Sequence, residues 1–158
     1  MLLKREHIIC VISAFLLFAL LRFVIFDVQS VQGNSMLPTL AENCLVLSLR
    51  APFAGTPRRG EVVTLCFEGE TIVKRIAEIG PCAVVWNDAS YHVSPDEGEE
   101  YANARAGRVH LPEGHAFLLG DNFASSEDSR SFGIRNCQAL SGRVIAVLYP
   151  FHAFGAVR

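Results

Sequence analysis

One long run of apolar residues stands near the start of the chain. From Ile8 to Phe26 every residue is apolar except Ser13 and Arg22, and these 19 residues are about enough for one helical crossing of a bilayer. Arg22 lies close to the end of the run, where its long side chain can extend to the bilayer surface. The pattern predicts a transmembrane anchor at residues 8–26.

The charges that flank this run predict its orientation. Lys4 and Arg5 precede it and Asp27 follows it, and positive residues favour the cytoplasmic side of a membrane segment. We therefore expect residues 1–7 to form a cytoplasmic tail and residues 27–158 to form an exported domain.

A cleavable signal peptide is the alternative interpretation of the same run. Its apolar region would be unusually long for a signal peptide, although Val28-Gln29-Ser30 offers a weak cleavage site. A retained anchor fits the length better.

Beyond the anchor, short apolar runs alternate with turn residues, and no long helical periodicity appears. Runs rich in valine, isoleucine, leucine and phenylalanine are typical of β-strands. The candidate strands are Cys44–Leu49, Glu61–Phe67, Thr71–Ile79, Ala83–Trp86, His115–Leu119 and Gly142–Leu148. The exported domain is therefore predicted to be mainly β, with antiparallel strands.

Two segments between the strands refine this prediction. Glu68-Gly69-Glu70 separates two strand patterns and predicts a hairpin. Residues 90–113 are polar and irregular, which predicts a surface excursion from the β domain. The acidic residues between positions 96 and 100 are interpreted as part of a solvated loop.

Lys74 is the one lysine beyond the N-terminal tail, and the hairpin places it in a sheet. Period-two alternation puts Lys74 on the same strand face as Ile72 and Ile76, while Val73 and Arg75 face the other way. Burial of an ammonium group disfavours its charged form and lowers its pKa. A buried Lys74 is thus a candidate general base, whereas an exposed strand lysine is the inert alternative.

Composition and charge limit the possible functions. A chain of 158 residues, 51% of them hydrophobic, can hold one membrane segment and one compact domain. From Asp27 onward there are 11 basic and 15 acidic residues, a net charge of −4. An acidic domain argues against nucleic acid as a partner.

The cysteines and histidines give no sign of a metal or cofactor site. No Cys-x-x-Cys pair occurs, and the histidines lack ligand spacing, so we expect neither a zinc site nor a cofactor. Four cysteines would face an oxidising compartment, and four thiols allow three pairings, among which the sequence does not choose. They are Cys44, Cys66, Cys82 and Cys137.

A general base needs a nucleophile, and Ser35 is the best candidate. It lies in a turn-forming segment, Gly33-Asn34-Ser35-Met36-Leu37-Pro38-Thr39. A serine hydroxyl attacks a carbonyl well only if a base removes its proton, and a desolvated lysine can take the role that histidine plays in a Ser-His-Asp triad. Taken alone, Ser35 would be better explained as a turn or helix-cap serine ahead of Pro38.

Three segments, in this order behind an N-terminal anchor, resemble the type I signal peptidase family of membrane-anchored serine proteases. Asn34–Leu40 has the nucleophile followed by Met-x-Pro-Thr. Arg59–Val63, running into Val73–Ile76, resembles the strand pair that carries the lysine base. Gly120–Gly133 is similar to the family's Gly-Asp-Asn segment, with its Ser-x-Asp-Ser-Arg motif. The resemblance implies a signal-peptidase-like antiparallel β domain, with Ser35 as nucleophile and Lys74 as base.

The resemblance also implies roles for residues that support the pair. Ser126 would hydrogen-bond and orient Lys74, and Asp128 and Arg130 would form a polar network behind it. Asp121 would pair with Arg75. A loop-stabilising Asx turn is the simpler interpretation of Asp121-Asn122, and it is compatible with that pairing.

This sequence departs from the family pattern at two places. Phe123-Ala124 stands where Arg-Asp is usual, which removes an ion pair and leaves the packing of that loop open. Gly33 stands where some members have a hydroxyl that helps to bind the oxyanion, so the backbone N–H of Ser35 is the one donor that the sequence identifies. Glycine at that position also allows a positive φ.

The implied substrate is an extended signal peptide. A peptide of this kind could pair with strand edges near Ser35, with alternate side chains entering apolar pockets. The resemblance places four residues among the pocket walls, which would select small residues such as alanine; ordinary core packing is the alternative role of the four. They are Val31, Met36, Leu40 and Val73.

The predicted function is that of signal peptidase I, a membrane-bound serine endopeptidase that removes signal peptides from exported preproteins. The expected location is the bacterial cytoplasmic membrane, or alternatively an organellar inner membrane, with signal peptides, the lipid bilayer and the translocation machinery as partners. A specialised relative, such as a conjugative-transfer or organellar inner-membrane maturation peptidase, is the first alternative. An inactive membrane-tethered binding module is the second, and the presence of both Ser35 and Lys74 argues against it.

Overall fold

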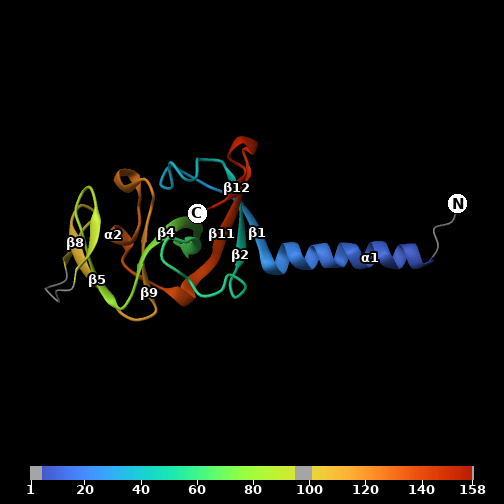
Figure 1. Cartoon of the computed structure of the whole chain (residues 1–158), viewed down its shortest axis with the longest axis horizontal. Coiled ribbons are helices and arrows are strands. Elements are labelled where there is room, and N and C mark those ends of the chain that lie inside the picture. The colour runs from blue at the N-terminus through green and yellow to red at the C-terminus, as the bar shows by residue number, and fades with distance from the viewer. Residues whose placement is uncertain (1–4, 95–100, 158) are drawn as a thin grey trace.

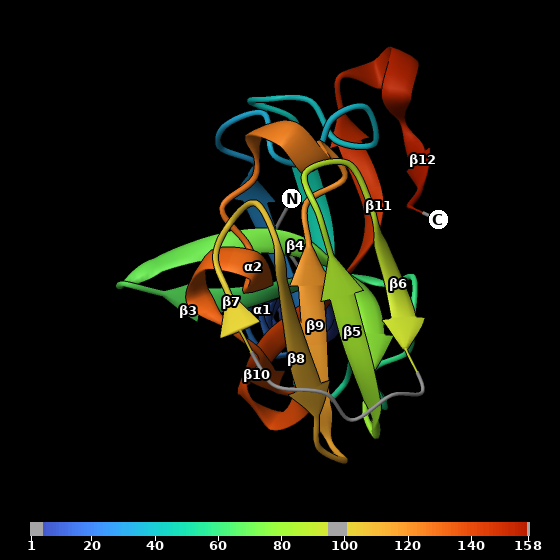
Figure 2. The same ribbon diagram turned by 90° about the vertical axis from the view of Figure 1, so that its left-hand side faces the viewer.

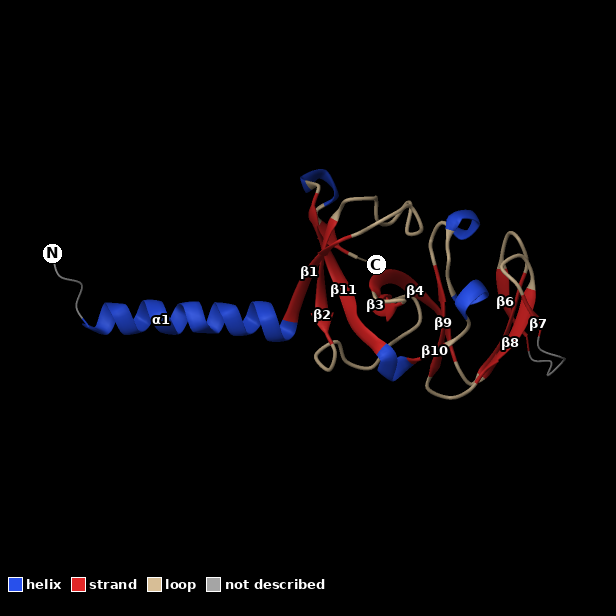
Figure 3. Cartoon of the chain, turned by 180° about the vertical axis from the view of Figure 1, so that it is seen from behind, coloured by secondary structure: helices blue, strands red, loops and turns tan. Residues whose placement is uncertain are grey.

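The computed structural model describes residues 5–94 and 101–157. Its N-terminal helix α1 (Arg5–Leu20) continues into a π-helical turn, η1 (Leu21–Ile25), and then directly into strand β1 (Phe26–Ser30). The helix extends away from the β domain, and none of its residues is buried (Figures 1 and 3). In the described part of the chain, Arg5–Ile25 is the one helical stretch that is long and apolar enough to cross a bilayer.

Charged side chains connect the end of the helix to the domain. The guanidinium of Arg22 lies 3.7 Å from the Asp27 carboxylate, and Arg50 approaches the same oxygen at 3.0 Å. Arg22 thus points toward the end of the apolar run, as its position in the sequence predicted.

The larger sheet contains eight strands, and all of its neighbours pair antiparallel. Its order is β1-β2-β11-β3-β4-β9-β10, and β12 pairs with β11. The mainly β, antiparallel prediction is confirmed. Besides β1, the strands are β2 (Leu45–Arg50), β3 (Val62–Phe67), β4 (Glu70–Ile79), β9 (His115–Leu119), β10 (Arg135–Asn136), β11 (Leu140–Tyr149) and β12 (Gly155–Ala156).

A second, four-stranded sheet lies at the end of the domain farthest from α1 (Figures 1 and 2). Its order is β6-β5-β8-β7. Short single-turn helices occupy some of the connections in the rest of the domain. The strands are β5 (Cys82–Trp86), β6 (Tyr91–Ser94), β7 (Tyr101–Ala102) and β8 (Gly107–Leu111), and the short helices are η2 (Phe123–Ser125), α2 (Ser129–Phe132), η3 (Cys137–Ala139) and η4 (Phe151–Ala153).

The second sheet corrects the expectation that residues 90–113 are irregular. Three of its strands, β6, β7 and β8, lie in that segment. They are short, and only a few of their side chains, among them Tyr91, Val109 and Leu111, pack against the core, so their apolar pattern is faint. The acidic residues between positions 96 and 100 lie outside the described residues.

The predicted hairpin is present and places Lys74 as expected. Strands β3 and β4 pair antiparallel across the two-residue turn Glu68-Gly69, and Val63 lies opposite Lys74. Ile76 belongs to one apolar cluster and Val73 to another, which confirms the alternation along β4. Both faces of the hairpin are therefore covered, and Lys74 is only 4% exposed.

Three apolar clusters form the core. One lies beside the loop that follows β1, the second packs around β3, β4 and β9, and the third joins β9 to the second sheet, where the rings of Trp86 and Phe117 are 5.2 Å apart. All five cysteines are unpaired in the structure, including the four that would face an oxidising compartment.

Candidate active site

The loop between β1 and β2 carries Ser35. Its base is closed where the Val31 N–H donates to the Cys44 carbonyl at 2.9 Å. Within it, the Leu40 N–H donates to the Met36 carbonyl at 2.8 Å and forms a single helical turn directly after Ser35. The Ser35 side chain is half-buried, so its hydroxyl is held by the domain yet reachable from solvent.

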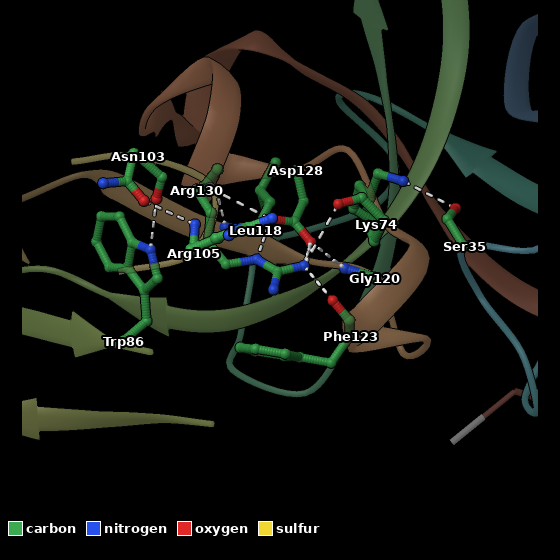
Figure 4. Close-up of polar contacts among 12 residues, drawn as sticks. Ser35, Lys74, Trp86, Asn103, Arg105, Leu118, Gly120, Phe123, Asp128 and Arg130 are labelled. Atoms are coloured by element: carbon green, nitrogen blue, oxygen red, sulfur yellow. Dashed lines mark hydrogen bonds and ion pairs between the residues drawn. The ribbon is translucent and has the colours of Figure 1, made fainter. Parts of the chain in front are cut away.

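Ser35 and Lys74 meet, as the sequence predicted. The Nζ atom of Lys74 lies 2.8 Å from the Oγ atom of Ser35, which is hydrogen-bonding distance (Figure 4). The two residues are 39 positions apart and come from a loop and from the central part of β4. This geometry allows direct transfer of a proton from the hydroxyl to the amine.

The surroundings of Lys74 favour its neutral form. Burial is the largest effect and lowers the pKa of the ammonium group below the ordinary value for lysine. The charges of Asp128 and Glu127 oppose this shift, and that of Arg130 supports it. On balance the pKa is lowered, which is the direction that a general base requires.

Asp128 and Arg130 form a buried ion pair near the lysine. The Nε and Nη2 atoms of Arg130 each lie 2.8 Å from a carboxylate oxygen of Asp128. The same carboxylate caps α2 by accepting from the Arg130 N–H, and it accepts from the Gly120 N–H at 3.1 Å. The pair thus joins α2 to the end of β9, which is a structural role behind the site.

Phe123 occupies the place where the sequence departs from the family pattern. Its ring lies under the Arg130 guanidinium, which is 3.8 Å from the ring centroid, and its carbonyl accepts from Arg130 at 2.6 Å. A cation stacked on an aromatic ring is stabilised by the ring quadrupole. The packing of this loop, which the sequence left open, is therefore supplied by an aromatic side chain.

Ser126 lies close to the catalytic segment but does not contact Lys74 by a hydrogen bond. Its hydroxyl is buried and has no hydrogen-bond partner within the described residues. It is packed against Gly120, where an added Cβ would lie 2.2 Å from the Ser126 Oγ and 2.4 Å from the Ser35 carbonyl oxygen. The expected bond from Ser126 to the lysine is thus absent from this structure, although the hydroxyl is near.

Arg75 pairs with Asp121, as expected. Two nitrogens of the guanidinium each lie 2.7 Å from a carboxylate oxygen of Asp121, and Arg75 also reaches Thr39 and the Gly60 carbonyl. Burial raises the pKa of Asp121, but hydrogen bonds from Arg75 and Thr39 outweigh burial and lower it. The Arg75 guanidinium therefore connects β4 to the segment after β9 through Asp121, and to the Ser35 loop through Thr39.

The four expected pocket residues come together in one buried cluster. Val31, Met36, Leu40 and Val73 are each at least nine-tenths buried, and Met36 is completely so. They pack with one another and with strands β2, β3 and β11. In this structure they form the core beneath the Ser35 loop, and none of them presents an open wall to solvent.

The backbone N–H of Ser35 is available for an external acceptor. It makes no hydrogen bond to any residue in the described ranges. Gly33, two residues earlier, has a φ of 72°, the left-handed conformation that the sequence suggested for it. Gly33 offers no side-chain donor, so the N–H of Ser35 is the donor that this loop presents.

Asn122 is the residue that sequence analysis missed. Its side-chain amide donates to the Asn34 carbonyl at 3.1 Å, and its backbone N–H donates to the Ser35 carbonyl at 2.9 Å. The sequence suggested an Asx turn at this position, a purely local role. A contact across 88 positions leaves no trace in spacing or periodicity, so the sequence alone could not identify it.

Among residues 5–94 and 101–157, no three potential metal ligands lie close enough together to hold an ion. The polar groups around Ser35 are instead a lysine, a buried acid–arginine pair and backbone amides. Groups of this kind suit nucleophilic acyl transfer.

Comparison with known proteins gives a consistent result. A family model described as signal peptidase, peptidase S26, matches residues 4–149. Signal peptidase I of Bacillus caldolyticus is 29% identical over 157 residues, which is 86% of this chain and 86% of that protein. Mitochondrial inner membrane protease subunit 1 of Schizosaccharomyces pombe is 31% identical over 132 residues, which is 80% of this chain and 75% of that protein.

A solved structure is also similar. The crystal structure of a signal peptidase I from Enterococcus faecalis is 21% identical, with a TM-score of 0.45. The match covers 56% of this chain and 97% of that one.

Proposed function

The chain belongs to the signal peptidase family, peptidase S26, and from this premise we propose that it is a membrane-bound serine endopeptidase that uses Ser35 as nucleophile and Lys74 as general base. One observation carries the assignment of the two residues. A lysine that is only 4% exposed holds its Nζ atom 2.8 Å from the Ser35 hydroxyl.

The first half of the reaction forms an acyl-enzyme. The neutral Nζ of Lys74 takes the hydroxyl proton as the Ser35 Oγ attacks the scissile carbonyl carbon. The carbonyl oxygen becomes an oxyanion and accepts a hydrogen bond from the Ser35 N–H. When the intermediate collapses, the lysine gives its proton to the leaving amine, and the mature protein is released with a free N-terminus.

The second half regenerates the enzyme. Lys74, neutral again, removes a proton from a water molecule that attacks the acyl carbon. A second tetrahedral intermediate collapses, the proton returns from Lys74 to the Ser35 Oγ, and the signal peptide leaves with a free carboxylate. Asp128 and Arg130 maintain the buried surroundings of the lysine without touching the reacting atoms.

We propose signal peptides of exported preproteins as substrates, with small residues next to the cleaved bond. The four residues that the family resemblance assigns to the pocket walls, Val31, Met36, Leu40 and Val73, form one buried cluster beneath the Ser35 loop, and in this proposal they shape the site next to the cleaved bond. The proposed location is the cytoplasmic membrane of a bacterium, with the N-terminus inside and the β domain on the exported side. The bilayer and the translocation machinery are the proposed partners.

A dedicated maturation peptidase of an organellar inner membrane is the second candidate. It is favoured by the mitochondrial relative, which is as similar to this chain as the bacterial one. Cleavage of a broad preprotein panel supports the general enzyme, whereas cleavage of one or a few members supports the dedicated one.

The direct test uses detergent-solubilised protein and a preprotein with an Ala-x-Ala site. Mass spectrometry should locate cleavage directly after the second alanine. Ser35→Ala should fold normally and lose at least ~10³-fold in kcat, because the nucleophile is gone while the binding groups remain. Ser131→Ala, which removes an exposed serine hydroxyl from α2, is the matched control. Near-normal turnover by Ser35→Ala would refute the assignment.

A further inference from the structure

Two carbonyls of the Ser35 loop are held by a single residue, Asn122. The Asn34 carbonyl accepts from the Asn122 Nδ2 at 3.1 Å, and the Ser35 carbonyl accepts from the Asn122 N–H at 2.9 Å. The Asn34 carbonyl also accepts from the Leu37 N–H at 3.2 Å. Asn122, in the segment after β9, therefore holds the loop at the peptide group between Asn34 and Ser35.

The two hydrogen bonds to the Asn34 carbonyl also fix the direction of the Ser35 N–H. The Asn34–Ser35 peptide is trans, so its C=O and the Ser35 N–H are parts of one planar unit and point in opposite directions. Two donors on the carbonyl oppose rotation of this plane. The Ser35 N–H is consequently held facing away from Asn122, without a hydrogen-bond partner of its own in the described chain.

We propose that Asn122 is a positioning residue for the oxyanion hole. Its side-chain amide fixes the Asn34–Ser35 peptide plane, so that the Ser35 N–H points at the oxyanion before the substrate arrives. The inference rests on the proposed function, in which this N–H stabilises the tetrahedral intermediate. Donors that are fixed in advance stabilise a developing charge most effectively, since no reorganisation is needed during the reaction.

The composition of the loop makes this positioning important. Gly33 supplies no hydroxyl donor, and its backbone φ of 72° belongs to a residue type that moves easily between conformations. The chain on the N-terminal side of Ser35 is therefore less restricted than it would be with a side chain at position 33. The bond from Asn122 compensates by holding the peptide plane from the neighbouring segment, which is itself fixed by the Arg75–Asp121 ion pair.

The test uses Asn122→Ala and Asn122→Asp in the full chain. Both variants keep the backbone bond to Ser35 and lose the amide donor, and aspartate also keeps the side-chain size. The alanine variant should lose about tenfold in kcat with KM within about twofold, which is the upper range for one neutral hydrogen bond. The aspartate variant should lose at least as much, because its carboxylate faces a carbonyl oxygen.

Asn136→Ala is the matched control. This asparagine is exposed, caps η3 by accepting from the Gln138 N–H at 2.8 Å, and pairs with His115 at the opposite end of β9 from Gly120. Its removal should leave kcat within about twofold. Melting temperatures and circular dichroism of all three variants identify any general loss of folding.

Inhibition by a peptide aldehyde tests whether Asn122 positions the oxyanion donor or only packs against the loop. The aldehyde forms a tetrahedral adduct on Ser35, so its inhibition constant should rise by the same factor as kcat falls. Binding of the uncleaved peptide, measured in Ser35→Ala with and without Asn122→Ala, should not change. The pH dependence of kcat should also keep its midpoint, because Asn122 does not touch Lys74.

Three results overturn the inference: unchanged kcat in both Asn122 variants, weakened binding of uncleaved peptide by the full factor, or a shifted pH midpoint. Each of them leaves the proposed function intact if Ser35→Ala is inactive. Activity in Ser35→Ala, by contrast, overturns the proposed function itself, so the two failures are distinguishable.

Discussion

The lowered pKa of Lys74 agrees with the lack of a hydrogen-bonded counter-ion within residues 5–94 and 101–157. Its hydrogen bond goes to a neutral hydroxyl, while Asp128, the carboxylate that most affects its pKa, is paired with Arg130. A lysine in this position loses the hydration of its charge and receives no full compensation. Under the proposed function, the ion pair would help Lys74 to act as a base, because the charge of Arg130 offsets that of Asp128 near the amine.

The first prediction concerns the proton on Lys74. Because burial lowers the pKa of Lys74 and the base must be neutral, kcat/KM should rise with pH through a pKa below that of free lysine and then level off. Lys74→Arg retains the positive charge but cannot give up its proton. It should therefore be as inactive as Lys74→Met, at least ~10³-fold below the unmodified enzyme.

Pre-steady-state or steady-state kinetics on both Lys74 variants across pH decide this point. If arginine restores a good part of the activity that methionine loses, the lysine acts as a fixed charge and the Ser-Lys mechanism is wrong.

The sequence revealed residues whose role follows from a local pattern, and it missed residues whose role depends on contacts between distant segments. Lys74 was predicted to be buried because alternation with Ile72 and Ile76 is a local signal, and the structure agrees. The contact of Asn122 with Asn34 and the buried, unpartnered hydroxyl of Ser126 depend on packing between loops. Family resemblance gave Ser126 a bond to the lysine, which the structure does not contain.

At the scale of elements, strands with a clear apolar pattern were predictable, and strands with few side chains in the core were not. The hairpin of β3 and β4 was expected because two strand patterns flank the turn segment Glu68-Gly69-Glu70. Strands β6, β7 and β8 have two to five residues each, with few side chains in the core. Their pairing with β5 and with one another comes from tertiary structure and could not be read from alternation.

Gly120 gives a prediction at this scale, because it is the point where β9 passes the Ser35 loop. In Gly120→Ala the new Cβ would lie 2.2 Å from the Ser126 Oγ and 2.4 Å from the Ser35 carbonyl oxygen. The loop must move, so kcat should fall by roughly 10–100-fold, with ~1–3 kcal/mol lost from the free energy of unfolding.

Gly142→Ala is the control for Gly120→Ala. Its Cβ would lie 2.4 Å from the Leu49 carbonyl, a similar clash between β11 and β2 rather than at the Ser35 loop. Denaturant unfolding should show comparable destabilisation in the two variants, and only Gly120→Ala should lose kcat. Equal losses of kcat in both would mean that the effect is general destabilisation.

At the scale of the whole molecule, helix α1 and the β domain form one continuous unit. Helix α1, the turn η1 and strand β1 follow one another without a linker, and β1 pairs with β2 from its first residue, Phe26. The Asp27 carboxylate accepts from Arg50 of β2 and lies near Arg22 of the helix. Length and apolarity predicted the helix, but its direct fusion to the sheet was not predicted.

The topology prediction uses Cys66, which is exposed on the β domain, whereas Cys44 is buried. A membrane-impermeant maleimide added outside intact cells, or outside spheroplasts, should label the protein, and Cys66→Ser should remove most of the labelling. Mass spectrometry of the membrane-extracted protein should find the segment 8–26 still attached. Labelling only after lysis would reverse the predicted orientation, and a mature N-terminus near Val31 would identify a cleaved signal peptide.

The direct connection from helix to sheet also fixes the distance between the end of the helix and Ser35. Ser35 follows the last residue of β1 by five positions, and its loop is fixed by Asn122 and by the Thr39–Arg75 contact. Under the proposed function, the height of Ser35 above the membrane would be constant, because no linker separates the helix from the sheet. Under the proposed function, a substrate is then selected by distance as well as by side chains, and moving a cleavage site along one preprotein a residue at a time would measure that reach.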